Sequence, residues 1–184
     1  MSLPLLWQEP LPAVPIPDLG GLWRRCPRTL GAPVLLHLGP QTLDLIWGPA
    51  PEEGLALPLG YADLAPRFFR HHPPRPEEWE GAIMAVEDLL APARPRVPPA
   101  GCLWCADSLV HALTELAAGP GAPAMAREAL EQCFQRLCQA RPSGLAGLPE
   151  GPEFAALVLV LRELLHHYGY AQVGWVAPEG AAGE

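Results

Sequence analysis

Lysine and asparagine are absent from this 184-residue sequence, and its twelve basic residues are all arginine. This bias is typical of a GC-rich genome and of thermal selection against asparagine, and it carries no information about function. The formal net charge is −8 and no segment concentrates the arginines, so we expect no nucleic-acid partner and no membrane partner. Long apolar runs are also lacking. The longest, from Phe154 to Leu161, falls well short of the roughly 20 residues that span a bilayer.

Targeting signals and a regular cysteine framework are lacking as well. The N-terminal segment has no basic region, and prolines from Pro4 onward interrupt its apolar residues, so we expect no signal peptide and a cytoplasmic location. The five cysteines are an odd number. Together with the missing export signal, this number favours reduced thiols over disulfide bonds.

The remaining composition predicts one domain with an N-terminal extension. Residues 1–32 are rich in proline and leucine, which favours extended chain over helix, and Trp7 and Trp23 suggest that this extension packs across the domain. Regular patterns occupy residues 33–178, and residues 179–184 form a tail. A domain of this length can bury enough surface to fold without disulfide bonds or a structural metal.

Hydrophobic periodicity in the domain predicts an α/β fold. The apolar or alternating runs 34–38, 42–47 and 55–59 predict three strands in an antiparallel meander. Helical patterns and two short strands follow. We expect helices at 63–70, from Pro76 onward, 107–118, 124–140 and 152–168, a strand near 101–103, and a closing strand at 171–176.

Three stretches of the sequence carry a resemblance to a known family. The first, Leu55 to Phe69, reads LALPLGYADLAPRFF and is followed by a Pro-Pro-x-Pro-Glu-Glu helix start; the others are Ala126 to Leu148 and Leu157 to Val176. Together they resemble the C-terminal actin-like domain of the exopolyphosphatase and guanosine pentaphosphate phosphatase family, over roughly residues 33–178. The resemblance implies an actin-like, ribonuclease H-like domain: a strand meander, several helices and a closing strand.

The phosphate-binding motifs of that family are degraded here. Its glycine-rich turn, D-x-G-G-G-S-T-E, corresponds to residues 37–44, where His37 replaces the aspartate, Pro40 removes a backbone donor and one glycine remains. Its second loop, G-x-G-G-T, corresponds to residues 101–105, and its helical Arg-Ala-Asp to residues 154–156, where both charges are lost. The first actin-like domain is not found in this sequence. These departures predict no catalytic residues and argue against phosphoanhydride hydrolysis.

Two small groups of residues remain as candidate sites. A remnant ligand site would consist of His37, Gly39, Thr42, Asp44 and Gly101, although a structural contact between His37 and Asp44 is the simpler interpretation. Cys102 and Cys105 form a C-x-x-C motif, which is either a redox pair, half of a zinc site, or a pair of buried reduced thiols. We favour the buried thiols, because no second ligand pair accompanies the motif.

Other polar residues give no further site. Adjacent helical side chains point about 100° apart, so neither His71-His72 nor His166-His167 can chelate as neighbours, and we expect no metal and no cofactor. We expect the acidic residues of the helix beginning at Pro76 to be solvated; they are Glu77, Glu78, Glu80, Glu87 and Asp88. No serine nucleophile motif, Walker loop or dinucleotide fingerprint is present.

The leading hypothesis is therefore a non-catalytic, exopolyphosphatase-related domain. A half-domain leaves an apolar face uncovered, which favours a protein partner or a homo-oligomer. The alternatives are a phosphate or nucleotide binder with a weakened site, and a redox or metal module at Cys102 and Cys105.

Overall fold

A computed structural model describes residues 18–28, 33–48, 53–99, 103–139 and 147–177. Within these ranges the chain forms one sheet of six strands and six α-helices. The strands are β1 (Val34–Leu38), β2 (Leu43–Ile46), β3 (Gly54–Leu57), β4 (Leu103–Cys105), β5 (Ala124–Ala126) and β6 (Gln172–Trp175). The helices are α1 (Leu19–Arg25), α2 (Tyr61–Phe68), α3 (Pro76–Ala93), α4 (Ser108–Ala118), α5 (Arg127–Cys138) and α6 (Pro152–Tyr168).

The sheet combines an antiparallel meander with parallel strands, in the order β3-β2-β1-β4-β6-β5. β1, β2 and β3 pair antiparallel, which confirms the predicted meander. β1, β4 and β6 are parallel neighbours, and their connections pass through helices because parallel strands need long crossovers. β5 then pairs antiparallel with β6 at the edge. The antiparallel meander, the helices and the last strand, β6, agree with the α/β arrangement that the resemblance implied.

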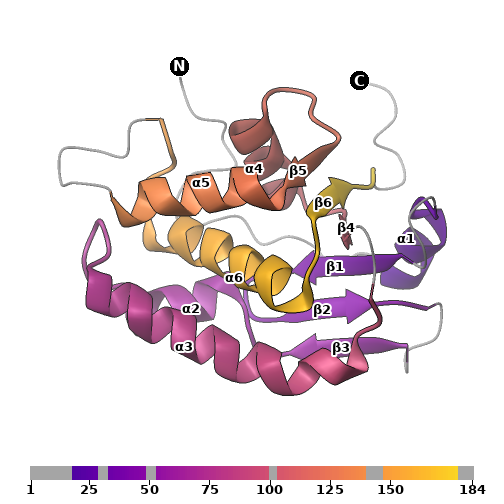
Figure 1. The fold of residues 1–184 in the computed structure, drawn as a ribbon, viewed down its shortest axis with the longest axis horizontal. Coiled ribbons are helices and arrows are strands. Elements are labelled where there is room, and N and C mark those ends of the chain that lie inside the picture. The colour runs from indigo at the N-terminus through magenta and orange to yellow at the C-terminus, as the bar shows by residue number, and fades with distance from the viewer. Residues whose placement is uncertain (1–17, 29–32, 49–52, 100–102, 140–146, 178–184) are drawn as a thin grey trace.

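One face of the sheet is covered by a layer of α2, α3, α5 and α6 (Figure 1). α6 lies in the middle of this layer and contacts the three other helices. Its residues from Phe154 to Leu161 are all buried, which explains why the sequence there is apolar on every side of the helix. In the described part of the chain, no helix combines the length and the apolar character needed to cross a membrane.

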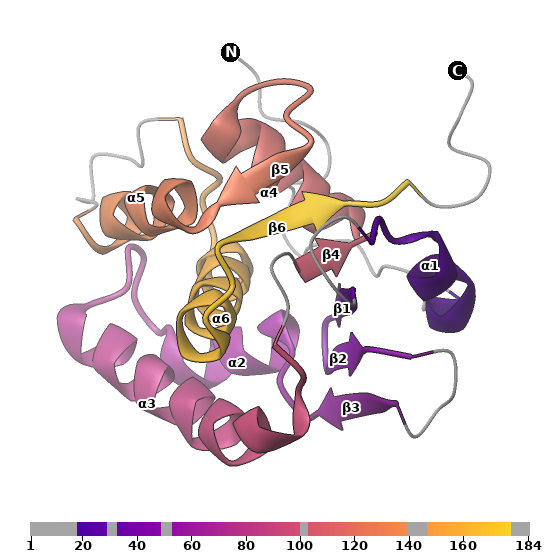
Figure 2. The same cartoon turned by 45° about the vertical axis from the view of Figure 1, so that its right-hand side comes forward.

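The short helix α1 lies against the opposite face of the sheet (Figure 2). Side chains alternate between the two faces of a strand, so Leu35 packs with α1 residues while Leu36 belongs to the main core. This small second cluster contains Leu22 and Cys26 of the α1 segment and Val176 beyond β6. It covers the part of this face where α1 contacts β1 and β2.

Three local predictions differ from the structure. Residues 19–25 are helical instead of extended, because Asp18 caps the first turn by accepting a hydrogen bond from the Gly21 N–H at 3.0 Å; residues 1–17 and 29–32 of the predicted extension lie outside the described residues. Ala124–Ala126, predicted as helix, forms β5, since pairing with β6 overrides the helix propensity of alanine. The strand predicted near 101–103 is Leu103–Cys105.

Two helix ends follow the predicted chemistry. α3 begins at Pro76, with Glu77 and Glu78 in its first turn, where proline and acidic residues are favoured. α6 ends at Tyr168, and the next residue, Gly169, has a φ of 74°. This left-handed conformation suits glycine and turns the chain toward β6.

Candidate functional site at the carboxyl ends of β1 and β4

β1 and β4 are neighbours in the middle of the sheet, and their carboxyl ends lie side by side. The two strands are parallel, with Val34 opposite Leu103 and Leu36 opposite Cys105. β1 continues into a turn closed by a hydrogen bond from Gly39 N–H to Thr42 O at 2.8 Å. In α/β sheets, loops at the carboxyl ends of strands are the usual place for a ligand. The first degraded phosphate turn, residues 37–44, begins at this end of β1, whereas residues 103–105 of the second form β4 itself.

Asp107, between β4 and α4, fills the space between the two strand ends. Its side chain is 2% exposed, and its Oδ1 lies 2.6 Å from His37 Nδ1. Its Oδ2 accepts hydrogen bonds from the backbone N–H of Leu38 at 2.7 Å and from the Cys105 thiol at 3.2 Å. A protein carboxylate thus takes the backbone donor at the end of β1, which is the kind of donor that a bound phosphate would need.

The Asp107 carboxylate affects the pKa values of its two neighbours, His37 and Cys105. Burial of His37 disfavours its charged form, but the hydrogen bond to Asp107 and the attraction of the Asp107 and Asp44 carboxylates outweigh burial and raise its pKa above 6.5. Burial and the Asp107 charge together raise the pKa of the Cys105 thiol well above 9. The imidazole therefore tends toward its protonated form, while Cys105 remains a protonated thiol and is a poor nucleophile.

The turn after β1 is held against the start of α2. The Pro40 carbonyl accepts a hydrogen bond from Ala62 N–H at 3.0 Å. A Cβ added to Gly60 would lie 2.2 Å from Pro40 O and 2.3 Å from Gln41 N, so only glycine fits at this position. Gly60 is the glycine of the LALPLGYADLAPRFF stretch, which gives that part of the resemblance a packing explanation.

Four residues of the predicted remnant ligand site lie around the turn after β1. A Cβ on Gly39 would be 3.3 Å from His37 Nε2 and 3.8 Å from Thr42 Oγ1. Thr42 donates a hydrogen bond to the Asp44 carboxylate at 3.0 Å, in an exposed position. His37 and Asp44 are opposite each other in the sheet register, but the hydrogen-bond partner of the imidazole is Asp107.

The predicted ligand site also included Gly101, and the predicted thiol site consisted of Cys102 and Cys105. Gly101 and Cys102 lie outside the described residues. Cys105, the other cysteine of the C-x-x-C motif, is a free, fully buried thiol. Sequence reasoning missed Asp107 as a site residue. The available signal was its position two residues after a short buried strand and directly before a helix.

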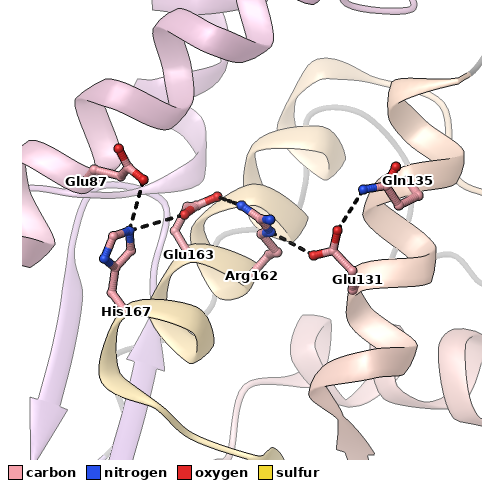
Figure 3. Close-up of polar contacts among 6 residues, drawn as sticks. All are labelled: Glu87, Glu131, Gln135, Arg162, Glu163 and His167. Atoms are coloured by element: carbon pink, nitrogen blue, oxygen red, sulfur yellow. Dashed lines mark hydrogen bonds and ion pairs between the residues drawn. The ribbon is translucent and has the colours of Figure 1, made fainter.

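A second polar group links three helices of the covering layer (Figure 3). His167 Nε2 of α6 lies 3.1 Å from Glu87 Oε1 of α3 and 3.5 Å from Glu163 Oε2, four residues earlier on α6. Arg162 contacts Glu163 and also donates to the Glu131 carboxylate of α5 at 2.8 Å. Glu87, predicted to be solvated, is 42% exposed and also pairs with His167.

Glu78 is the other acidic residue of α3 that the structure draws into contacts. Its carboxylate accepts hydrogen bonds from the N–H groups of Arg70 and Arg75 at 3.0 and 2.9 Å and lies 2.8 Å from His71 Nδ1. Burial would raise the pKa of Glu78, but these bonds and the His71 charge lower it to about 2. Glu78 is thus a helix-capping residue, which corrects the prediction of a solvated side chain.

This arrangement of strands and helices is also found in solved structures. The PPX-GPPA enzyme of Aquifex aeolicus matches with a TM-score of 0.70 and 14% identity over 88% of this chain. The chain has the fold of part of a Ppx/GppA protein. An exopolyphosphatase from Cytophaga hutchinsonii matches over 88% of the chain with a TM-score of 0.67 and 14% identity, and an exopolyphosphatase-like protein over 87% with 0.64 and 12%.

The likeness concerns the fold and only part of those proteins. This chain covers 58% of the Aquifex aeolicus structure, 59% of the Cytophaga hutchinsonii structure and 62% of the exopolyphosphatase-like protein. No sequence family and no curated protein matches the chain.

Proposed function

We propose that this chain is a non-catalytic relative of the exopolyphosphatases that works by binding another protein chain or a second copy of itself. The observation that carries the proposal is the Asp107 carboxylate between the ends of β1 and β4, which accepts hydrogen bonds from Leu38 N–H and the Cys105 thiol and pairs with His37. In this proposal the carboxyl ends of β1 and β4, where relatives would hold phosphate, are instead joined to each other by Asp107.

Phosphate binding at these strand ends is disfavoured, because the nearby backbone donors are already bonded. The backbone N–H of Leu38 is bonded to Asp107, and that of Gly39 to Thr42 O. An entering phosphate would also have to displace the Asp107 carboxylate from the Leu38 N–H and from its pair with His37. The proposal therefore ranks a weakened phosphate site second.

A redox or metal function at the C-x-x-C motif is ranked third. The Cys105 thiol is fully buried, and its pKa is raised well above 9 by burial. Reactive thiols need the opposite conditions, which are exposure and a lowered pKa. Cys105 in this environment suits packing in the core.

A binding surface for a protein partner is offered by the helical layer. An open groove of about 550 Å³ crosses α5 and α6. Its lining residues are charged or polar, but the surface that they expose in the groove is mostly apolar; they are Arg127, Glu128, Glu131, Gln132, Arg162 and His166. Among the described residues, Met84 is the only large apolar side chain that is exposed, so we expect an interface built on charged side chains and their aliphatic stems instead of the apolar face inferred from the sequence.

The non-catalytic part is tested by thermal shift with phosphate, polyphosphate and guanosine nucleotides, with and without magnesium. Binding at a hundredfold excess over the dissociation constant stabilises a protein by about 2.7 kcal/mol, which raises the melting temperature of a chain of this size by roughly 5 to 10 °C. We expect no shift and no release of phosphate from polyphosphate. A saturable shift that His37→Ala abolishes would refute this part.

The binding part is tested first as self-association. Light scattering after gel filtration should give a mass above the 19.8 kDa of one chain at 100 μM. Glu128→Arg, at an exposed groove position, should lower that mass, while Glu80→Arg, at an exposed position on α3 outside the groove, should not. A monomer mass for the unmodified chain at this concentration would refute self-association.

A further inference from the structure

Three side chains with metal-ligand atoms meet between α3 and α6. They are Glu87 of α3 and Glu163 and His167 of α6, and their ligand atoms all lie within 4.8 Å of one another (Figure 3). Glu163 and His167 are four residues apart and so share one face of α6. His167 therefore has partners on α3 and in the preceding turn of α6, and it does not need the adjacent His166 to bind a metal.

The buried carboxylate of Glu163 leaves one oxygen without a hydrogen-bond donor. Its side chain is 0% exposed, and its Oε1 pairs with Arg162. Its Oε2 is buried and has no hydrogen-bond partner, although it lies 3.5 Å from His167 Nε2. An unsatisfied buried acceptor costs about 1–3 kcal/mol, and more for a charged group. A cation between these side chains would remove that cost.

The spacing of the ligand atoms fits a tetrahedral ion. Zinc binds imidazole nitrogen and carboxylate oxygen at about 2.0–2.2 Å, which places neighbouring ligand atoms roughly 3.3–3.5 Å apart in a tetrahedron. The distances from His167 Nε2 to Glu87 Oε1 and to Glu163 Oε2 are 3.1 and 3.5 Å. His167 and Glu87 are 25% and 42% exposed, so an ion can reach the group and a water can take the fourth position.

The local charge also favours a divalent cation. Glu87, Glu131 and Glu163 carry three negative charges and Arg162 one positive charge, which leaves −3 + 1 = −2 with His167 neutral. The nearby Arg94 donates to the backbone carbonyl of His167 and pairs with none of these carboxylates among the described contacts. A doubly charged ion would balance the group.

We propose that Glu87, Glu163 and His167 bind a divalent transition-metal ion of the zinc type, which ties α3 to α6. One imidazole nitrogen with two carboxylates suits zinc and its neighbours in the first transition row, whereas magnesium prefers oxygen ligands in an octahedron. This site uses none of the residues at the carboxyl ends of β1 and β4, and it stands independently of the proposed function.

The experiment is a zinc titration of the full chain by calorimetry, carried out with ZnCl2 on metal-free protein in a Cys102→Ser background to remove the C-x-x-C pair. We expect one equivalent of saturable binding and a rise in melting temperature with zinc. Glu87→Gln and His167→Gln should each weaken the affinity at least tenfold, since even residues that only support metal ligands contribute 10- to 100-fold.

His166→Gln is the matched control, because His166 is adjacent on α6 but is not one of the three ligand residues. It should leave the zinc affinity unchanged. Glu87 is partly exposed, so Glu87→Gln should fold even if substitution of the buried Glu163 does not, and circular dichroism checks this. Absence of saturable binding, or an affinity that Glu87→Gln and His167→Gln leave unchanged, would overturn the proposal and identify the group as an ion-pair network between the helices.

Discussion

Replacing Asp107 with alanine should destabilise the protein far more than replacing an ordinary polar residue. The substitution leaves the buried imidazole of His37 without its counter-charge and the Leu38 N–H without an acceptor. Removing one partner of a buried ion pair costs about 3–5 kcal/mol. For a chain of this size we therefore expect the melting temperature to fall by roughly 6–20 °C.

Urea unfolding followed by circular dichroism measures this change, and a double-mutant cycle separates its causes. Asp107→Ala combined with His37→Leu should be less destabilising than the sum of the single changes, because the double variant no longer buries an unpaired charge. Asp44→Asn is the matched control, since Asp44 lies opposite His37 but contacts only Thr42 among the hydrogen bonds of the described residues. It should cost less than about 1 kcal/mol.

The pH dependence supplies a second readout of the same contact. The folded pKa of His37 is raised above 6.5, so its stabilising contribution is complete below about pH 6.5 and is lost as the pH rises through the folded pKa. Asp107→Ala should abolish or reverse this slope, because burial alone lowers the pKa of a histidine. A loss of stability no larger than that of Asp44→Asn, with the slope unchanged, would refute the reasoning.

Two further predictions concern packing and thiol chemistry. Gly60→Ala should lower the free energy of unfolding by about 1–3 kcal/mol, because its Cβ would lie 2.2–2.3 Å from the Pro40 and Gln41 backbone; a variant as stable as the parent in urea would contradict the close approach. Cys105 is fully buried, so a thiol reagent analysed by peptide mass spectrometry should label it only after unfolding, and more slowly than the partly exposed Cys138.

Elements that depend on local pattern could be predicted from the sequence. β1 is a fully buried apolar run, and α6 combines a proline in its first turn with a glycine directly after its end. In both elements, local propensity and burial favour the same structure. The predicted order of strands and helices then matched the fold of solved structures that are only 12–15% identical in sequence.

Elements that depend on distant partners could not be predicted in the same way. Ala124–Ala126 reads as helix in isolation, and only its pairing with β6 makes it a strand. His37 and Asp107 are 70 residues apart, and their contact requires β1 and β4 to be parallel neighbours. The polar group around Glu163 depends on distant partners too, because Glu87 comes from α3 and Glu131 from α5.

The two edges of the sheet affect how this protein can associate. β3 and β5, the edge strands, have four and three residues. Pro58 follows β3 and Pro123 precedes β5, and proline offers no N–H for a further strand. Short edge strands flanked by proline are poor templates for strand addition and so protect against aggregation. Association of this chain with itself or with a partner should therefore proceed through helical surfaces.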